Sequence, residues 1–152
     1  MNQEQPTIVF MMVGIPGSGK STAAAKLQEE YLAEVHNADS IREELYGDAS
    51  IQGDGKEVFG LLYSRARADV SIGCPVILDN CNVSRRDRKR AMKQFRNKNV
   101  RFIAVCVNTP ADECLRRNQA RDRVVPEWVV NRAASRYKVP SLDEGFVEVR
   151  FM

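Results

Sequence analysis

The chain of 152 residues lacks any run of about 18 apolar residues, the length that a helix needs to cross a membrane. Its first residues, MNQEQP, are polar and lack the apolar core of a secretory signal. These absences argue against a membrane-spanning helix and a secreted protein. They predict a protein that stays in the cytoplasm and has no membrane partner.

The sequence is also poor in metal-binding side chains. It has one histidine, His36, and its four cysteines, at 74, 81, 106 and 114, form no C-x-x-C pair. A zinc site is therefore not expected. Cys106 lies in an apolar run and is predicted to be a buried, reduced thiol rather than a disulfide partner.

No internal repeat or low-complexity segment interrupts the chain. With 43% hydrophobic and 28% charged residues, it is long enough for one hydrophobic core and too short for two ordinary ones. We expect one domain over residues 1–152.

Apolar runs and glycine or proline breaks alternate along the chain. They predict strands at residues 7–13, 34–37, 76–78, 101–107 and 146–151. They predict helices at residues 21–33, 41–46, 56–72, 85–98, 110–118 and 126–137, with Ser84 and Thr109 as caps of the fourth and fifth. Strands that alternate with helices predict an α/β fold with a mostly parallel sheet covered on both faces.

A glycine-rich segment stands between the first predicted strand and the first predicted helix. Residues 14–21, GIPGSGKS, match the P-loop pattern G-x-x-x-x-G-K-[ST]. Glycines in this loop turn backbone N–H groups around phosphate oxygens, and the helix N-terminus adds partial positive charge. The motif predicts binding of ATP or another NTP by Gly14, Pro16, Gly17, Ser18, Gly19, Lys20, Ser21 and Thr22. Lys20 would reach the β- and γ-phosphates, and Ser21 would be a ligand of Mg²⁺. A chance match is the alternative, and the strand–loop–helix context disfavours it.

Asp39 and Arg42 follow the second predicted strand, so a parallel sheet would bring them to the same edge as the P-loop. A hydroxyl acceptor needs a general base, and an acceptor phosphate needs a cation. Asp39 could instead be a helix cap, but Ser40 and Glu43 match a capping box that would leave Asp39 spare. We predict a functional carboxylate at Asp39 and a substrate contact at Arg42, with an ordinary solvated arginine as the alternative.

Two further positions carry charges that suit phosphate transfer. Asp79 ends the third predicted strand, where it could lie near Mg²⁺ or a catalytic arginine, or act only as a turn residue. Residues 116–123, RRNQARDR, precede Pro126 and predict a short arginine lid, since a guanidinium can pair with phosphoryl oxygens at two points. Any one of these arginines could instead be an ordinary cation at a helix end.

Charge is distributed unevenly, although the net charge is only +3. Residues 85–101 carry nine basic side chains and one acidic residue, Asp87. This cluster could follow a nucleic-acid backbone. A solvated helix face is the other interpretation, favoured by the lack of stacking aromatic residues between the charges.

These motifs resemble the kinase domain of phage-type polynucleotide kinases and related P-loop kinases. The resemblance covers nearly the whole chain and depends on GIPGSGKS at 14–21, NADSIR at 37–42, LDN at 78–80 and RRNQARDRVVP at 116–126. It implies a kinase-type P-loop NTPase fold, a three-layer sandwich with about five strands and an arginine lid. It also implies that Asp39 takes the proton of a 5′-hydroxyl and that Arg42 holds the acceptor's 3′-phosphate. Asp79 would orient a lid arginine, and Arg117 and Arg121 would stabilise the transferred phosphoryl group.

One departure from the family bears on the acceptor: Ser40 stands where some members have an acidic residue. The first hypothesis is a polynucleotide 5′-hydroxyl kinase that uses ATP and Mg²⁺ and acts on DNA or RNA. A kinase of a small metabolite or a nucleotide-linked sugar stays open, as does an NTP-binding switch without phosphate transfer.

Overall fold

The computed structural model describes residues 5–122 and 124–152, so residues 1–4 and the lid residue Arg123 lie outside the description. Within the described residues, five parallel strands form one sheet in the order β2-β3-β1-β4-β5. The strands are β1 (Thr7–Val13), β2 (Glu34–His36), β3 (Val76–Leu78), β4 (Val100–Cys106) and β5 (Phe146–Phe151). The predicted α/β class is confirmed.

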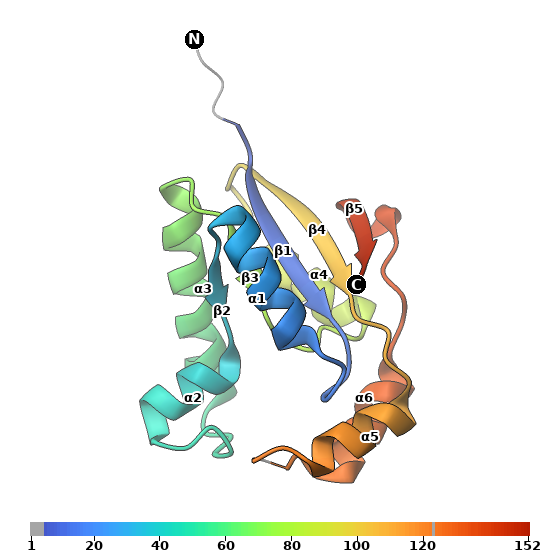
Figure 1. Ribbon diagram of the computed structural model, residues 1–152. Coiled ribbons are helices and arrows are strands. Elements are labelled where there is room, and N and C mark those ends of the chain that lie inside the picture. The colour runs from blue at the N-terminus through green and yellow to red at the C-terminus, as the bar shows by residue number, and fades with distance from the viewer. Residues whose placement is uncertain (1–4, 123) are drawn as a thin grey trace.

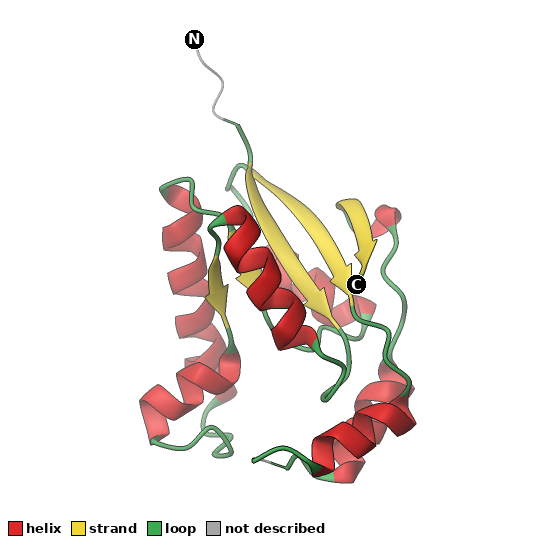
Figure 2. Cartoon of the chain, viewed as in Figure 1, coloured by secondary structure: helices red, strands yellow, loops and turns green. Residues whose placement is uncertain are grey.

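Helices connect the strands and cover both faces of the sheet (Figures 1 and 2). In Figure 1, α1 lies in front of the sheet and α4 behind it, while α3, at the left, packs with α4 against the face opposite α1. This is the predicted three-layer arrangement. The helices are α1 (Lys20–Tyr31), α2 (Ala38–Tyr46), α3 (Gly55–Ser71), α4 (Arg85–Lys93), α5 (Ala111–Gln119) and α6 (Glu127–Arg136), and a short 3-10 helix, η1 (Leu142–Glu144), precedes β5.

The side chains of β1 build the two interfaces between these layers. Val9 and Met11 pack with residues of α2, α3 and α4, while Phe10 and Met12 pack with α1. All four side chains are fully buried. Full burial of a side chain of this kind stabilises a fold by about 1.5–3 kcal/mol. A continuous apolar run is therefore what a strand between two helical layers requires.

The order of the strands sets the position of the site. β2 and β3 lie on one side of β1, and β4 and β5 lie on the other. Because the strands are parallel, the loops after β1, β2, β3 and β4 open at the same edge, the lower one in Figure 1. Ligands of open parallel sheets bind at such an edge, where the chain changes direction across the sheet. The polar motifs of the sequence follow these same strands.

The start of α2 corrects a predicted cap. Its N-cap is Asn37, whose side-chain oxygen accepts a hydrogen bond from the Ser40 N–H at 3.1 Å. The predicted capping box of Ser40 and Glu43 is therefore wrong, and Asp39 lies in the first turn of the helix. Asn37 is also held by a distant element, because its Nδ2 donates to the Asp79 carbonyl oxygen at 3.0 Å.

Two other helix ends differ from the prediction. α4 ends at Lys93 rather than at residue 98, because the chain tightens into turns that bury Phe95 and give Asn97 a left-handed φ of 70°. Thr109 does not cap α5, whose N-cap position is Pro110. The Thr109 hydroxyl instead donates to the Ser18 carbonyl oxygen at 2.7 Å. Thr109 thus joins the loop after β4 to the P-loop.

Cys106 is buried, as predicted, and this burial raises the pKa of its thiol to about 11. Across the part of the chain that the structure describes, the helices are too short or too polar to cross a membrane.

Candidate active site

The P-loop lies between the end of β1 and the first turn of α1. Gly17 and Gly19 adopt left-handed φ angles of 84° and 98°, which residues with a Cβ rarely adopt. Gly17 also packs against α5, where an added Cβ would lie 2.6 Å from the Cys114 carbonyl oxygen. Position 17 therefore requires glycine both for its backbone conformation and for its close approach to α5.

The start of α1 is open to an anion. Gly19 occupies the N-cap position without a side-chain cap, and the first turn contains no acidic residue. The Ser18 side chain is 1% exposed and lies within the loop, since a Cβ added at Gly14 would be 2.6 Å from its Oγ. This hydroxyl has no hydrogen-bond partner among the described residues. A helix N-terminus, a buried hydroxyl and the half-buried Lys20 suit a chain of phosphates.

Ser21 and Asp79 place two oxygen ligands side by side. Ser21 Oγ donates to Asp79 Oδ2 at 3.0 Å, and Asn37 Nδ2 donates to the same oxygen at 3.2 Å. Asp79 is 5% exposed, and its Oδ1 lacks a partner within residues 5–122 and 124–152. A hydroxyl and a buried carboxylate are ligands that Mg²⁺ uses in P-loop proteins. These residues fit a Mg²⁺ site.

Asp39 and Arg42 form an ion pair at the start of α2. Arg42 Nη1 donates to Asp39 Oδ1 at 3.0 Å. The Arg42 side chain is 13% exposed, and its guanidinium lies 5.9 Å from the centroid of the Phe59 ring. Its Nε is buried and unpaired in the described part of the chain. Helix α3 thus fixes Arg42, and Arg42 fixes the Asp39 carboxylate.

An open cleft of about 420 Å³ is lined by four of the predicted site residues, Ser21, Asp39, Asp79 and Arg121. Its lining residues are Ser21, Ala24, Ala25, Gln28, Val35, Asn37, Asp39, Ser40, Ala49, Asp79 and Arg121. The structure therefore brings Asp39, Asp79 and a lid arginine to the same space as the P-loop serine. Arg42 and Arg117 do not line this cleft.

Two described arginines of the lid segment, residues 116–123, lie in different positions. Arg117 Nη1 donates to the Ser18 carbonyl oxygen at 3.4 Å, and Arg117 Nε donates to Glu113 Oε1 at 3.0 Å. Hydrogen bonds from Arg116 and Arg117 lower the pKa of Glu113. Arg121 follows α5 and reaches the cleft. Arg117 therefore lies beside the P-loop, and Arg121 lines the cleft. In the described chain, Asp79 bonds Ser21 and Asn37 rather than either arginine.

Asn118 is a residue of this region that sequence reasoning missed. It is 2% exposed at the end of α5. Its Oδ1 accepts from the Val125 N–H at 2.9 Å, and its Nδ2 donates to the Val125 carbonyl oxygen at 2.5 Å. These bonds close the segment that contains Arg121. The local sequence carries little signal for this role, because Asn118 stands among charged residues and only the tertiary structure buries it.

A second cavity of about 280 Å³ lies beside Ile15 of the P-loop. The residues that line it are Ile15, Val107, Asn108, Thr109, Pro110, Ala111, Ala134 and Tyr137. The lining is largely apolar, and the Tyr137 hydroxyl donates to the Asn108 side-chain oxygen. Its composition suits a flat, mostly apolar group.

A parallel sheet in this strand order, with a P-loop after β1, Arg117 in α5 and Arg121 after it, defines the fold of a P-loop kinase domain. The chain belongs to the AAA domain family AAA_33, whose model matches residues 9–140. No curated protein matches the chain.

Solved structures of low sequence identity share this fold. The chain is similar to one from a Pnkp1/Rnl/Hen1 RNA repair complex, with 19% identity and a TM-score of 0.79 over 89% of this chain and 45% of that chain. It is similar to the APS kinase CysC of Mycobacterium tuberculosis, solved with AMPPNP and APS, with 22% identity and a TM-score of 0.69 over 97% and 90% of the two chains. A fungal RNA kinase has 18% identity and a TM-score of 0.68 over 98% of this chain and 38% of that chain. The chain thus spans less than half of either RNA-related protein, and these identities show the fold alone.

Proposed function

We propose that the protein transfers the γ-phosphate of ATP to the 5′-hydroxyl of a polynucleotide. The observation that carries this proposal is the shared cleft, in which Asp39 faces the same space as Ser21 and Asp79. A site that only binds NTP needs ligands for the phosphates, whereas a transferase also needs a base where the acceptor enters. Asp39 is that additional group.

On the donor side, the P-loop N–H groups and Lys20 hold the β- and γ-phosphates, and the second cavity takes the base of the nucleotide. When bound, Mg²⁺ on Ser21 and Asp79 neutralises charge on the phosphate oxygens. Arg117 and Arg121 stabilise the charge that spreads over the transferred phosphoryl group. Their positions beside the P-loop and in the cleft lining support this role.

On the acceptor side, Asp39 accepts the proton of the attacking hydroxyl. Arg42 sets the direction of the Asp39 carboxylate, because its guanidinium is held between Oδ1 and the Phe59 ring. Arginine has five N–H donors, so Arg42 can orient the base and still offer other N–H groups to a phosphate of the acceptor.

The distribution of charge supports a polynucleotide as the acceptor. Outside residues 85–101, the chain has 14 basic and 19 acidic residues. Within that segment, eight described side chains form an exposed basic surface: Arg85, Arg86, Lys89, Arg90, Lys93, Arg96, Lys98 and Arg101. Arg85 is six residues from Asp79, so this surface begins within about 20 Å of the cleft. Such a surface attracts a polyanion. Two of the similar structures are of an RNA repair complex and an RNA kinase.

A small-molecule acceptor is the second candidate. The cleft volume of about 420 Å³ lies in the range of small-ligand sites. The similar APS kinase was solved with APS, a small acceptor, over nearly the whole length of both chains.

The two candidates are separated by incubating the protein with γ-labelled ATP, Mg²⁺ and a panel of 5′-hydroxyl oligonucleotides, nucleosides and sugars. We expect label on the oligonucleotides, with an acceptor affinity that falls steeply as salt rises, because phosphate contacts release counterions. Label only on a nucleoside or sugar, without salt dependence, would contradict a polynucleotide acceptor.

Asp39→Asn tests the base. We expect turnover to fall by about 10²–10⁴-fold, the usual contribution of a general base, with little change in ATP affinity. Glu43→Gln is the matched control, because Glu43 is an exposed carboxylate one turn later on the same helix. It should keep wild-type turnover. Unchanged turnover in Asp39→Asn would remove Asp39 from the reaction.

A further inference from the structure

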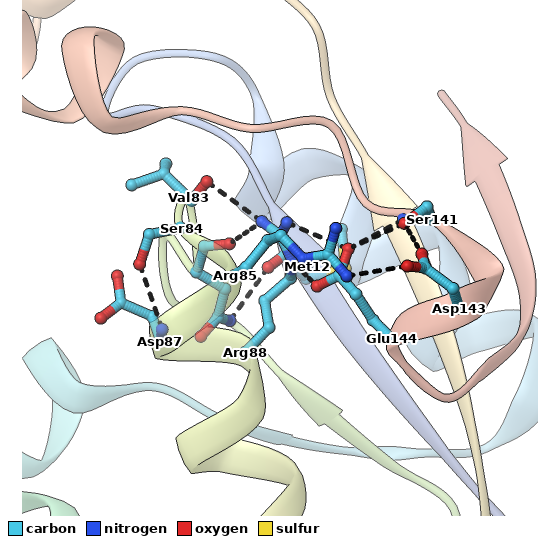
Figure 3. A network of polar contacts seen from close by, with 10 residues as sticks. Met12, Val83, Ser84, Arg85, Asp87, Arg88, Ser141, Asp143 and Glu144 are labelled. Atoms are coloured by element: carbon cyan, nitrogen blue, oxygen red, sulfur yellow. Dashed lines mark hydrogen bonds and ion pairs between the residues drawn. The ribbon is translucent and has the colours of Figure 1, made fainter.

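A buried arginine joins two elements that lie outside the cleft. Arg88 on α4 is fully buried, unlike the exposed basic surface formed by its neighbours. Its Nε and Nη2 donate to the carboxylate oxygens of Glu144 in η1 at 2.8 and 3.2 Å. Its Nη1 donates to the carbonyl oxygens of Asn82 and Val83, both at 3.0 Å (Figure 3).

The backbone that Arg88 holds belongs to the loop after β3, residues 79–83. On its other side this loop contacts the start of the P-loop. The Gly14 N–H donates to the Cys81 carbonyl oxygen at 3.0 Å, and Asn82 Nδ2 donates to the Met12 carbonyl oxygen at 3.0 Å. The loop begins with Asp79, the partner of Ser21. It therefore links the Arg88–Glu144 pair to the P-loop and to the proposed Mg²⁺ ligand.

The contacts explain why this residue is arginine. A guanidinium can bind both carboxylate oxygens with two nitrogens and turn the third toward two carbonyl groups. Lysine offers a single ammonium and cannot span the carboxylate and both carbonyls. Stability alone is a weak reason for the pair, because apolar residues can often replace a buried ion pair without loss of stability.

We propose that Arg88, braced by Glu144, is a positioning residue for phosphoryl transfer. It fixes the 79–83 loop and, through this loop, the Asp79 carboxylate and the first residues of the P-loop. This inference rests on the proposed function. Arg88 lines neither cavity, so it acts through the loop. A displacement of about 1 Å at a reacting centre can cost about 100-fold in rate, which gives such support its importance.

The test replaces the ion pair by apolar side chains in a double variant, Arg88→Met with Glu144→Met. Because this kind of replacement is often neutral for stability, we expect thermal unfolding close to that of the wild type. The Asn82 and Val83 carbonyls lose their shared donor. We expect the Mg²⁺ concentration for half-maximal binding of a fluorescent ATP analogue to rise about tenfold, as is common when groups behind a metal ligand are removed.

Amide hydrogen exchange of the metal-free protein gives a second readout. The Gly14 N–H, which bonds the 79–83 loop, should exchange about tenfold faster in the double variant because local opening becomes easier. Glu144→Gln is the matched control, since it keeps the side-chain shape and leaves Arg88 its carbonyl bonds. This control should unfold at a lower temperature and keep the wild-type Mg²⁺ dependence and Gly14 exchange.

A stable double variant with wild-type Mg²⁺ dependence and wild-type exchange would overturn the proposal and reduce the pair to a structural support. If the double variant does not fold, Arg88→Lys is measured in its place. We expect the same rise in the Mg²⁺ concentration for half-maximal binding and the same faster exchange of the Gly14 N–H. Wild-type values for both in Arg88→Lys would equally contradict the proposal. Neither the Mg²⁺ dependence of nucleotide binding nor the exchange of the Gly14 N–H requires an acceptor. If the labelling experiment finds no acceptor, the proposed function is contradicted, but these two measurements still test the role of Arg88.

Discussion

Two buried polar regions, joined by the 79–83 loop, differ in how their hydrogen bonds are satisfied. Around the P-loop and the cleft, Ser18 Oγ, Arg42 Nε and Asp79 Oδ1 are buried and unpaired as far as the structure describes the chain. Arg88 is equally buried, yet its guanidinium makes four hydrogen bonds. Each unpaired buried group costs about 1–3 kcal/mol. The fold therefore tolerates unpaired atoms near the proposed phosphate site and avoids them in its support.

The difference gives the two regions opposite expected responses to mutation. Removing an unpaired group near the proposed phosphate site should stabilise the protein in the absence of ligand and should weaken its affinity for the ligand. Removing one member of the Arg88–Glu144 pair should weaken the fold, because the other member then stays buried without a charged partner. Three variants, of which Glu144→Gln is already described above, probe this contrast, and they are ordered by the size of their expected effect on nucleotide binding.

The largest effect is expected from Gly17→Ala. The new Cβ would lie 2.6 Å from the Cys114 carbonyl oxygen, so the P-loop and α5 must move apart. We expect nucleotide affinity to fall on the order of 100-fold. Gly73→Ala is the matched control, because Gly73 also has a positive φ, of 80°, but a Cβ added there would point into open space among the described residues. It should lose about 1–2 kcal/mol of stability and bind nucleotide normally. Equal binding by the two variants, measured by calorimetry, would contradict a specific role for the P-loop geometry.

For Ser18→Ala we expect a smaller loss of nucleotide affinity, together with a gain in the stability of the unliganded protein. The variant removes the unpaired hydroxyl, so the unliganded protein should become more stable by about 1 kcal/mol in denaturant unfolding. A hydrogen bond to a charged phosphate is lost as well, so we expect nucleotide affinity to fall about tenfold. If Ser18→Ala is less stable than the wild type and binds nucleotide with unchanged affinity, the contrast between the two regions is contradicted. The Ser18 hydroxyl would then stabilise the fold, as the paired groups around Arg88 do.

No effect on binding, but an effect on pH dependence, is expected from Glu144→Gln. Burial raises the pKa of Glu144, but hydrogen bonds from Arg88 and the Ser141 N–H and the charges of Arg88 and Arg85 outweigh it, so the pKa is lowered. A lowered pKa stabilises the fold above the unfolded-state value, about 4.3, and this stabilisation is lost as pH falls through the folded-state value.

Thermal unfolding between pH 7 and pH 3 checks this expectation. Between pH 7 and pH 3, the unfolding temperature of the wild type should fall further than that of Glu144→Gln. The unfolding temperatures of the two proteins should therefore become similar in acid. Glu148→Gln is the control, because Glu148 pairs with Arg150 on the surface and the Glu148 side chain is 46% exposed. Arg150 lowers the pKa of Glu148 as well, but this pair is exposed to solvent, so Glu148→Gln should follow the wild type much more closely than Glu144→Gln does. A constant difference between wild type and Glu144→Gln would show that the carboxylate charge is not what stabilises the network.

Much of the fold could be predicted because its signals are local. The apolar run of β1, the glycines that follow it and the helix after them lie within 25 successive residues. Their order fixes a strand, a phosphate loop and a helix without knowledge of distant contacts. The strand after residue 145 and the start of α6 after Pro126 were likewise marked by alternation and by proline.

The errors occurred where distant residues compete with local signals. Ser40 and Glu43 match the local pattern of a capping box, but Asn37 caps α2 because Asp79, in the loop after β3, holds its amide. The sequence does not distinguish Arg88 from the basic residues around it at 85–101, and only its contacts with Glu144 and the 79–83 loop set it apart. Asn118 was hidden in the same way among charged neighbours.

The sequence by itself determined the chemistry of the P-loop and the alternation of strands and helices, because both follow from residue types at fixed short spacings. The tertiary structure decided which side chains share the cleft, which arginine is buried and which buried atoms stay unpaired. These properties depend on contacts across 40 to 60 positions of sequence, as between Asn37 and Asp79 or Arg88 and Glu144. Such contacts exist only once the parallel sheet and the helices around it have assembled.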